Sequence, residues 1–462
     1  MKILLVVYDN DSYVSEFPIS LAYISAILMR EGHEVDIYNQ DIHHYKDEEL
    51  TRVLDETKYD VVGVSVIAGY YQYRKLLKLS DAINRSKNRP IFIIGGHGPS
   101  PEPDFFLKKT QADIIVIGEG EDTTVELFKA LSDKSGLAGI AGIAHRDGDK
   151  VVTNTRRALI KDIDTIPFPA YHKFPIEHYR MTRMPHILKS EFALPILSGR
   201  GCTFTCNFCY RMDKGFRPRK VEYIVEEMRL LKKDYGITYF AFYDELLMSS
   251  VERTEEIAEG FIKAGLNVKW NCNGRLNYAR PELLKLMKKS GCVFINYGIE
   301  AMDDQILKNM KKGLTVKQVI SGIEATLAAG ISPGYNIIFG NIGEGRETLQ
   351  KGVDFLLKYD DGAQMRTIRP VTPYPGSPLY YHAIKEGLLK DVEDFYENKH
   401  TNSDLLAVNF TNMTDDEFYA AMTEANMALT KNYYDKMSAN VLNQVKHLYS
   451  SRDATFRGFR QT

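Results

Sequence analysis

The stretch GCTFTCNFCY, residues 201–210, places three of the chain's five cysteines close together, as Cys202, Cys206 and Cys209. A disulfide framework calls for an even number of spread cysteines, whereas a tight cluster indicates a metal centre. A structural zinc site or an electron-transfer cluster uses four protein ligands, and the two remaining cysteines lie far downstream. Three thiolates therefore predict an iron–sulfur cluster with one iron open to a substrate or cofactor. A structural zinc knuckle is the alternative.

The cysteine loop follows the first strand of a regular series of strands and helices. Apolar runs predict strands at 194–198, 239–243, 268–271, 293–298, 335–339 and 365–371. Helical patterns lie between them, at 221–235, 254–264, 281–289, 316–329 and 347–358. Six βα units in series predict a partial barrel whose chemistry lies on the loops that follow the strands.

A second series of this kind occupies residues 1–130. Its predicted strands are continuous apolar runs, at 3–8, 34–38, 61–66, 91–94 and 114–117. Such strands, separated by helices, predict a doubly wound parallel sheet that binds ligands beyond the carboxyl ends of its strands. Residues 8–12, after the first strand, contain no glycine, which argues against a dinucleotide site. Glycines instead follow the fourth and fifth strands, at Gly95-Gly96-His97-Gly98 and Gly118-Glu119-Gly120-Glu121, where backbone can approach a large flat ligand.

These patterns divide the chain into four parts. Residues 1–135 are expected to form the doubly wound domain and residues 191–383 the barrel. Between them, residues 136–190 hold a hairpin signal and a proline-containing stretch, which predicts an extended connection. Residues 384–462 are predicted to be helical. Their many aromatic side chains are expected to pack in a core. The alternative is that some of them shape the substrate pocket, with this part of the chain as a lid over the barrel mouth.

Charge and hydropathy exclude several kinds of partner. The chain has 59 Lys and Arg against 61 Asp and Glu, a net charge of −2, so nucleic acid is not an expected partner. No apolar run approaches the about 20 residues that a membrane helix needs. The N-terminus also lacks the cleavage site of a signal peptide. The sequence therefore predicts a cytoplasmic globular protein without a membrane span.

With its CxxxCxxC spacing after the first barrel strand, the chain resembles the radical SAM superfamily over residues 190–380. The resemblance implies that the three cysteines hold a [4Fe–4S] cluster and that S-adenosylmethionine (SAM) binds its open iron. Matching positions imply SAM contacts from Phe208, Asp244, Glu245, Glu300 and Gly340. Arg275 is a further candidate, because its guanidinium can donate two parallel hydrogen bonds to the SAM carboxylate. The alternative for Asp244 and Glu300 is that they are surface acids beside helices. The reduced cluster would give one electron to SAM, and the resulting 5′-deoxyadenosyl radical would take a hydrogen atom from the substrate.

Joined to such a barrel, the first domain resembles the cobalamin-binding domain of cobalamin-dependent radical SAM enzymes. The resemblance implies cobalamin contacts from Asn10, Pro18, Ser65, Val66, Tyr70, Gly95, Gly96, His97, Gly98, Gly118, Glu119 and Gly120. Histidine ligation of cobalt uses a DxHxxG motif, but Lys46 stands at the glycine position after Asp41 and His43, which predicts a surface turn. His97 is expected to line the pocket. Cobalamin is therefore expected to bind without a histidine ligand, which favours transfer chemistry at cobalt.

The resulting hypothesis is a cobalamin-dependent radical SAM methyltransferase that acts on an unactivated carbon of a small molecule, lipid or peptide. Flavodoxin or ferredoxin is the expected electron donor. Ring formation, rearrangement or oxidation without methyl transfer stays open, as does a non-catalytic cobalamin- or metal-sensing module. Methylthiotransferases carry three cysteines in their first domain and are excluded, because no cysteine precedes Cys202. Cys272 and Cys292 are expected to be buried core residues.

Overall fold

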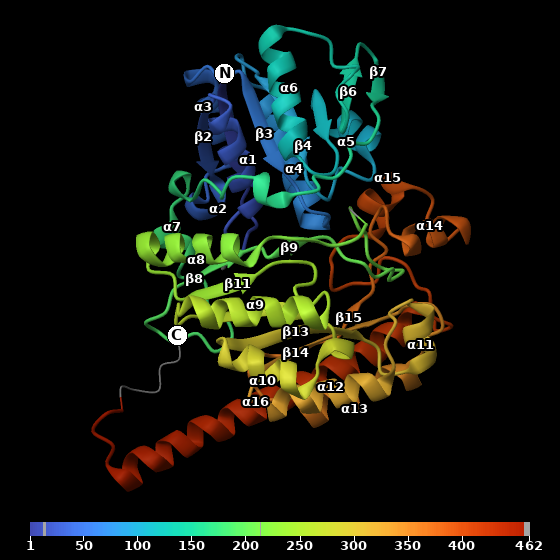
Figure 1. The fold of residues 1–462 in the computed structure, drawn as a ribbon. Helices are drawn as coiled ribbons and strands as arrows, with labels where there is room; N and C mark the ends of the chain where they lie inside the picture. Colours follow the sequence, from blue (N-terminus) through green and yellow to red (C-terminus); the bar gives the residue numbers. More distant parts are fainter. Residues whose placement is uncertain (13–14, 213, 457–462) are drawn as a thin grey trace.

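The computed structural model describes residues 1–12, 15–212 and 214–456. Its N-terminal part is built on a sheet with the strand order β2-β1-β3-β4-β5-β6-β7 (Figure 1). The parallel strands are β1 (Lys2–Val7), β2 (Glu34–Asn39), β3 (Val61–Ser65), β4 (Ile91–Gly95) and β5 (Ile114–Val116). The hairpin of β6 (Ile143–Asp147) and β7 (Lys150–Thr153) continues this sheet as two antiparallel strands.

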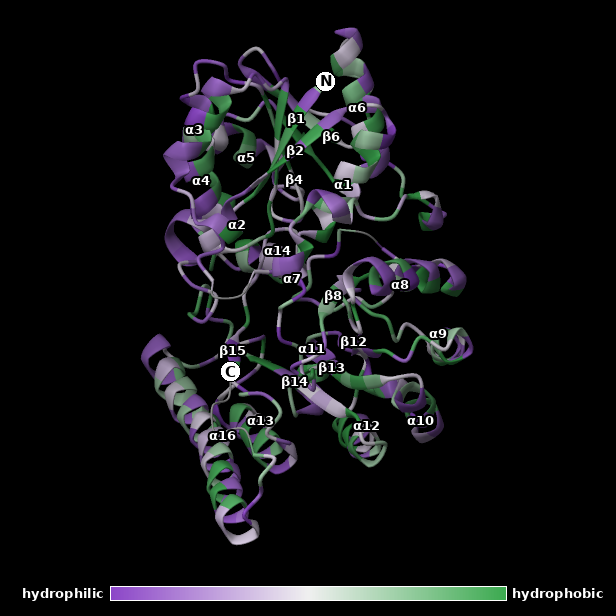
Figure 2. Ribbon diagram, turned by 90° about the vertical axis from the view of Figure 1, so that its left-hand side faces the viewer, coloured by the Kyte–Doolittle hydropathy of each residue, from purple (hydrophilic) through white to green (hydrophobic). Residues whose placement is uncertain are grey.

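Helices cover both faces of this sheet, because successive residues of a strand point to opposite sides. On β1, Ile3 and Leu5 pack into one core, and Leu4 and Val6 into another. One face carries α1 (Ile19–Arg30) and α6 (Glu121–Asp133), and the other carries α3 (Asp47–Glu56), α4 (Tyr70–Asn84) and α5 (Pro103–Thr110). The single turn α2 (Gln40–His43) follows β2. Figure 2 shows hydrophobic strands between helices with hydrophilic outer sides, as the doubly wound prediction requires.

The second sheet curls into a half-barrel of six parallel strands in the order β15-β14-β13-β12-β11-β8. Its strands are β8 (Ala193–Ile196), β11 (Tyr239–Phe242), β12 (Lys269–Gly274), β13 (Cys292–Glu300), β14 (Ser332–Phe339) and β15 (Arg369–Pro370). Its helical elements are α8 (Val221–Tyr235), α9 (Val251–Ala264), η3 (Leu276–Tyr278), α10 (Pro281–Lys289), α11 (Asp304–Asn309), α12 (Val316–Ala328) and α13 (Arg346–Tyr359). The partial barrel is thus confirmed.

The connection between the two sheets is folded and packed rather than extended. It contains η1 (Ile163–Thr165), η2 (Tyr171–Lys173) and α7 (Ile176–Tyr179). The rings of Tyr171 and Tyr179 lie 5.4 Å and 5.6 Å from the ring of Phe17, which precedes α1. Burial of these aromatic side chains holds the proline-containing stretch against the first domain.

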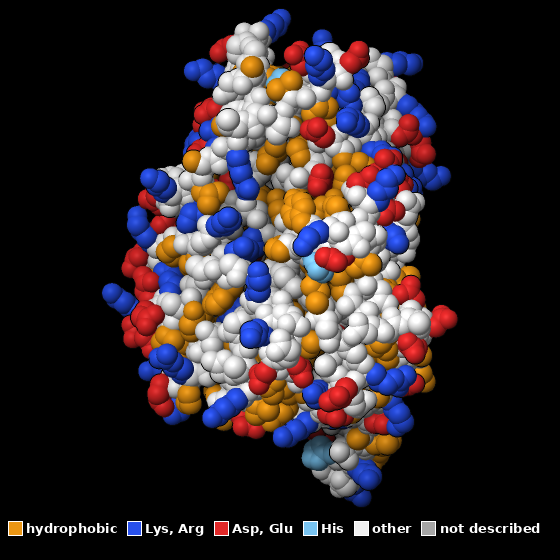
Figure 3. Space-filling view, turned by 90° about the vertical axis from the view of Figure 1, so that its right-hand side faces the viewer, with side chains coloured by type: hydrophobic (Ala, Val, Ile, Leu, Met, Phe, Trp, Pro, Cys, Tyr) orange, Lys and Arg blue, Asp and Glu red, His pale blue; other side chains and the backbone are white. Residues whose placement is uncertain are grey.

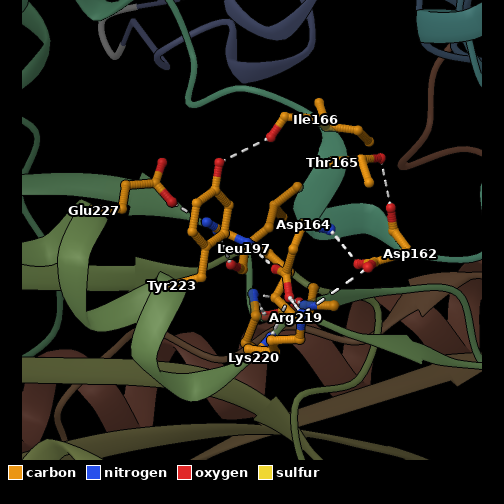
Figure 4. Close-up of polar contacts among 12 residues, drawn as sticks. Asp162, Asp164, Thr165, Ile166, Leu197, Arg219, Lys220, Tyr223 and Glu227 are labelled. Atoms are coloured by element: carbon orange, nitrogen blue, oxygen red, sulfur yellow. Dashed lines mark hydrogen bonds and ion pairs between the residues drawn. The ribbon is translucent and has the colours of Figure 1, made fainter.

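Polar contacts hold the same connection against the barrel, as Figure 4 shows. The backbone N–H of Lys220 donates to Asp164 at 2.9 Å. Arg219, two residues before α8, pairs with the fully buried Glu227 at 2.6 Å, and the hydroxyl of Tyr171 donates to Glu227, also at 2.6 Å. The connection therefore joins both sheets into one body.

The C-terminal helical part packs in two separate places. Its elements are α14 (Pro378–Lys385), α15 (Val392–Asp394), the π-turn η4 (Phe395–Lys399) and α16 (Asp415–Ser451). Tyr396 packs on Tyr73 of the N-terminal part, with ring centroids 4.7 Å apart, whereas Phe418 of α16 stacks on Phe339 of the barrel at 5.0 Å. Several aromatic side chains of this part are core residues, as expected, but Tyr434 of α16 is 58% exposed. The C-terminal end of α16 extends past the barrel (Figure 1).

Charged side chains of both signs are interspersed over the surface, as the face in Figure 3 shows. This distribution matches the near-zero net charge of the chain. None of the helices in the described part of the chain is long and apolar enough to cross a membrane.

Candidate active site between the two sheets

A cavity of about 350 Å³ lies where the carboxyl ends of the first sheet face the barrel. One wall comes from β1, β3, β4 and β5 with helices α1 and α6. The barrel side contributes Leu197, Gly199, Arg200, Met212, Tyr243 and Glu245. Parallel strands end at a common edge, and the loops that leave this edge make room for a ligand. Because Arg200 precedes the cysteine loop and Met212 follows it, the cavity and the loop share a wall.

The residues present in this cavity fit cobalamin, which has a flat ring and a nucleotide tail. Near the strand ends, Gly96 has φ +101°, and a Cβ there would lie 2.5 Å from the carbonyl oxygen of Val66, so no side chain is tolerated. Farther in, the lining is apolar and includes Leu5, Leu28 and Phe128, from the layer between the sheet and helices α1 and α6. A glycine-rich mouth admits a flat macrocycle, and the apolar interior suits an aromatic tail.

Seven of the predicted cobalamin residues line this cavity: Ser65, Gly95, Gly96, His97, Gly118, Glu119 and Gly120. Val66 and Gly98 lie directly behind, where the N–H of Gly98 donates to the carbonyl of Val66 at 3.0 Å. Pro18 precedes α1, and Asn10 donates its backbone N–H to Asp41 at 3.0 Å. Tyr70 opens α4 and its ring faces His400 at 6.5 Å, away from the cavity lining. The structure thus gathers the glycine turns, and the contacts of all twelve residues with cobalamin stay predictions.

His97 is the histidine that the structure places at the cavity. Its side chain is exposed to the cavity, but protein atoms lie around it. This burial lowers the pKa of His97, whereas the negative charge of Glu245 acts to raise it. Its ring lies 6.3 Å from that of Tyr210, which follows Cys209. His44 instead pairs with Asp9 at 2.8 Å on the surface. His43 and Lys46 are exposed, as a surface turn requires, but Asp41 is only 1% exposed, so the prediction of a surface turn is wrong for Asp41.

The thiols of the cysteine loop lie at different depths: Cys206 is buried, and Cys202 and Cys209 are half-buried. The pKa of Cys206 is lowered because Cys209 donates a hydrogen bond to it and because the cations Lys312 and Arg275 are close. Among the described residues, no three His, Cys, Asp or Glu side chains converge on a single point. A cubane binds each thiolate through a different iron, whereas zinc needs its ligands around one atom. Three thiolates in one loop can therefore each bind one iron of a [4Fe–4S] cluster.

Asn207, in the middle of the cysteine loop, braces it against three other segments. Its backbone N–H donates to Met310 at 2.9 Å, and its carbonyl accepts from the N–H of Leu379 at 2.8 Å. Its side-chain amide exchanges two hydrogen bonds of 3.1 Å with the amide of Asn341. Asn207 is buried, so each of these polar groups would lose free energy if its partner were removed. The loop conformation therefore depends on one central amide.

Asp244 and Glu245, at the end of β11, hold the segment 198–201 that leads into the cysteine loop. Asp244 accepts from the N–H groups of Ser198 at 2.8 Å and Gly199 at 2.5 Å, and Glu245 accepts from that of Gly201 at 3.0 Å. Burial raises the pKa of Asp244 to about 7, against the lowering effect of these donors. Asp244 is 1% exposed, so it is no surface acid. Its predicted contact with SAM is additional to this anchoring role.

Glu300 ends β13 in a bulge with φ +71° and receives the ammonium of Lys312 at 2.8 Å. Gly298 leaves room for this pair, because a Cβ there would lie 2.4 Å from the Glu300 carboxylate. Both members of the pair are buried, so the surface-acid alternative is wrong for Glu300 also. Positive φ is an uncommon backbone conformation for a residue other than glycine, and residues that adopt it cluster at functional sites.

Arg275 lies beside this pair, with its guanidinium 3.4 Å from the ring centroid of Phe204, and it also donates to the carbonyl of Lys312. Burial lowers its pKa. Phe208 packs beside Met310 and lies 5.8 Å from the Lys312 ammonium. Two cations and one carboxylate thus flank the cysteine loop, which suits the anionic thiolates of a cluster and the carboxylate of SAM.

Gly340 follows β14 with φ +105°, and a Cβ there would lie 3.0 Å from the ring of Phe418. The N–H groups of Gly340 and Asn341 both donate to Glu344, each at 2.8 Å. Burial raises the pKa of Glu344 to about 8, although these donors oppose the shift. Because the side chain of Asn341 is hydrogen-bonded to Asn207, Glu344 supports the cysteine loop indirectly, through Asn341.

Sequence reasoning missed a chain of amides inside the half-barrel. Asn336 donates to Asn296 at 3.0 Å, Asn296 donates to Asn273 at 3.1 Å, and Asn273 donates to the carbonyl of Asp244 at 2.8 Å. The signal was available, because asparagine is disfavoured in buried parallel strands. Lys312 and Asn207 were missed for another reason, since neither occupies a position with a recognisable pattern and only the tertiary contacts single them out.

Comparisons with known proteins agree with this geometry. The family model of the radical SAM superfamily matches residues 196–356, and that of the B12 binding domain matches residues 6–128. A protein of Pyrococcus horikoshii, the uncharacterized methyltransferase PH0819, is 30% identical over 84% of this chain and 84% of its own length. The cytidylyl-2-hydroxyethylphosphonate methyltransferase of Streptomyces wedmorensis is 27% identical over 82% and 80%. The anaerobic magnesium-protoporphyrin IX monomethyl ester cyclase of Cereibacter sphaeroides is 28% identical over 79% of this chain and 60% of its own length.

The structure of the radical SAM methyltransferase TsrM from Kitasatospora setae, with cobalamin and a [4Fe–4S] cluster bound, shares the fold. It superposes with a TM-score of 0.74 at 18% identity and covers 93% of this chain and 88% of its own. A B12-binding domain followed by a radical SAM barrel defines a class of enzymes. This chain belongs to the cobalamin-dependent radical SAM family, whose cofactors are a [4Fe–4S] cluster, SAM and cobalamin.

Proposed function

We propose that this enzyme transfers a methyl group from SAM to an unactivated carbon of a small molecule, lipid or peptide. The observation that carries the proposal is the wall shared by the cavity and the cysteine loop, formed by Gly199, Arg200 and Met212. In this family the cluster supplies one electron to SAM, and cobalamin supplies a carrier for a one-carbon group. Two cofactor sites with one common wall bring both functions to one substrate.

The chain's own residues orient the reactants and keep water away. Asp244 and Glu245 fix the backbone that leads into the cysteine loop, and Asn207 fixes the loop itself. Arg275, Lys312 and Glu300 provide charges for the two ends of the SAM methionyl group and for its ribose. The apolar lining of the cavity excludes water, which protects a reactive radical from side reactions.

The experiment uses the reconstituted enzyme, a chemical reductant and SAM that carries a deuterated methyl group. A fractionated metabolite extract serves as the source of substrate, and products are followed by mass spectrometry. Methyl transfer is supported when a product gains the mass of one deuterated methyl group in place of hydrogen. A Cys206→Ala enzyme is the control and is expected to transfer no label.

Cyclisation, rearrangement or oxidation remains the second candidate, because the cyclase of Cereibacter sphaeroides is also similar to this chain. It predicts a substrate that is consumed without gain of the labelled methyl group. Family membership favours either reaction over a non-catalytic sensing module. Flavodoxin or ferredoxin as the physiological electron donor belongs to this proposal and can be tested by replacing the chemical reductant.

A further inference from the structure

Glu119 lines the cobalamin cavity, yet protein donors already occupy its carboxylate. Oε1 accepts from Arg200 at 3.0 Å and from Arg217 at 2.9 Å. Oε2 accepts from Arg217 at 2.8 Å and from the backbone N–H of Ile160 at 2.9 Å. Both Arg217 contacts come from one nitrogen, Nη1, so two arginine side chains and one backbone amide occupy most of the about four acceptor positions of this carboxylate. Protein donors therefore hold the Glu119 carboxylate on both of its oxygens.

A second acid completes the network. Glu121 receives Arg200 at 2.6 Å, and the Arg200 guanidinium also lies 5.4 Å from the ring centroid of Tyr23. The side chains of both acids are less than 10% exposed, and those of both arginines less than 20%. Burial alone would raise the pKa of Glu119, but Arg217, the Ile160 amide and Arg200 together lower it. Two buried cations thus balance two buried anions, and removal of one member leaves an uncompensated charge.

The network connects the two cofactor sites. Glu119 lies on the turn between β5 and α6, and Glu121 is the first residue of α6; both line the wall of the cobalamin cavity. Arg200 ends β9 (Gly199–Arg200), two positions before Cys202, and pairs in register with Arg217 of β10 (Arg217–Pro218). β9 and β10 bracket the cysteine loop, so the acids of one site hold both ends of the loop of the other.

We infer that Glu119 is a positioning residue that sets the cobalamin cavity at a fixed distance and orientation from the cysteine loop. It acts through Arg200 and Arg217 and not through contact with cobalamin. The inference deepens the proposed function, because radical chemistry at one cofactor and group transfer at the other must meet at one substrate atom. The distance measurement that tests the inference does not need a substrate, so this measurement can fail or succeed independently of methyl transfer.

The test measures the interaction between the two cofactors by pulsed electron paramagnetic resonance. Holoenzyme is loaded with paramagnetic cob(II)alamin and a reduced [4Fe–4S] cluster, and the dipolar coupling gives the distribution of distances. Glu119→Gln is expected to bind cobalamin within about threefold of the unchanged enzyme, with a broadened or shifted distance distribution. Because misplacement of about 1 Å costs up to about 100-fold in rate, the yield of labelled product per SAM cleaved is expected to fall about tenfold or more.

Two further variants separate positioning from ligation. Glu119→Gln combined with Arg217→Gln removes one charge of each sign and is expected to restore a narrow distribution. Arg217→Lys keeps the charge but loses the planar guanidinium whose Nη1 contacts both Glu119 oxygens, and is expected to broaden the distribution less. Glu126→Gln is the matched control: Glu126, on α6, pairs with Arg157 at 2.5 Å, but its side chain is 53% exposed and lies outside the cavity lining. It is expected to change nothing.

Two results would overturn the inference. One is an unchanged distance distribution in Glu119→Gln, which would remove any positioning role. The other is a loss of cobalamin affinity greater than tenfold that the double variant does not repair, which would make Glu119 a ligand of cobalamin. If Glu119→Gln does not fold, the comparison of Arg217→Lys with the control decides by the same measurement.

Discussion

The cysteine loop gathers its functional residues in ten consecutive positions, whereas the cobalamin cavity takes its wall from four strands, two helices and the start of the barrel. The loop presents three chemically irreplaceable thiols, and single residues such as Asn207 hold it in place. The cavity presents mostly backbone and apolar side chains. A local site concentrates its function in few side chains, and a distributed site spreads it over many small contributions.

This difference teaches where substitutions are costly. In the loop, the identity of a side chain is decisive, because thiolate ligation has no substitute. In the cavity, the absence of a side chain is decisive at the glycine turns, and the charged network around Glu119 is a second sensitive part of the wall. The predictions below test this contrast, beginning with the largest expected effect.

Replacement of any one of Cys202, Cys206 and Cys209 by alanine is expected to abolish reductive cleavage of SAM, because the cluster loses a ligand. Iron and sulfide analysis after anaerobic reconstitution and the yield of 5′-deoxyadenosine check this. The matched control is Cys272→Ala, which removes a buried thiol of β12 and is expected to keep both the cluster and the cleavage. Cleavage at the normal rate by an alanine variant of the loop would disprove the cluster assignment.

Gly96→Ala is expected to weaken cobalamin binding about ten- to 100-fold, the equivalent of about 1–3 kcal/mol of backbone strain. The new Cβ would sit 2.5 Å from the carbonyl oxygen of Val66, at a φ of +101°. Titration with cobalamin, followed by absorbance, measures the effect. Gly139→Ala is the control, since a Cβ there meets open space. An affinity equal to that of the unchanged enzyme would show that this turn does not shape the site.

Asn207→Leu keeps the size of the side chain but removes its amide, and leaves the amide of Asn341 without its partner. We expect about tenfold slower SAM cleavage and faster loss of iron, as for other residues that orient metal ligands. Single-turnover assays and the decay of the cluster absorbance in air report the two effects. Asn398→Leu, on the surface, is the control and should behave as the unchanged enzyme. Equal rates for both variants would show that the loop needs no brace.

Glu344→Gln should change the dependence of stability on pH. Burial raises the pKa of Glu344 from 4.5 to about 8, so the folded chain keeps a proton that the unfolded chain releases. The contribution of this group to stability is therefore complete below pH 4.5 and is lost as the pH rises to about 8, at no more than about 1.4 kcal/mol per pH unit. Thermal unfolding of the apoprotein between pH 5 and 8 is expected to show a smaller fall in Tm for Glu344→Gln. Parallel curves for the two proteins would contradict the shift.

Much of the fold could be predicted, because periodic burial leaves a pattern in the sequence. The helices expected at 221–235 and 281–289 coincide with α8 and α10. The strand expected over 365–371 shrank to Arg369–Pro370, where Pro370 has no N–H for the ladder. The connection, expected to be extended, is folded because Tyr171 and Tyr179 find apolar partners that lie far away in the sequence.

The sequence alone determined the chemistry: three closely spaced thiols, two glycine-rich turns and their order along the chain identify the cofactors. These signals are local, since ligand spacing and positive φ depend on adjacent residues. Only the tertiary structure decided which charges meet. It pairs Glu119 with two arginines and Lys312 with Glu300, and it joins the side-chain amides of Asn341 and Asn207 by hydrogen bonds. Such pairings join residues remote in sequence, and buried charges must find partners wherever packing brings them together.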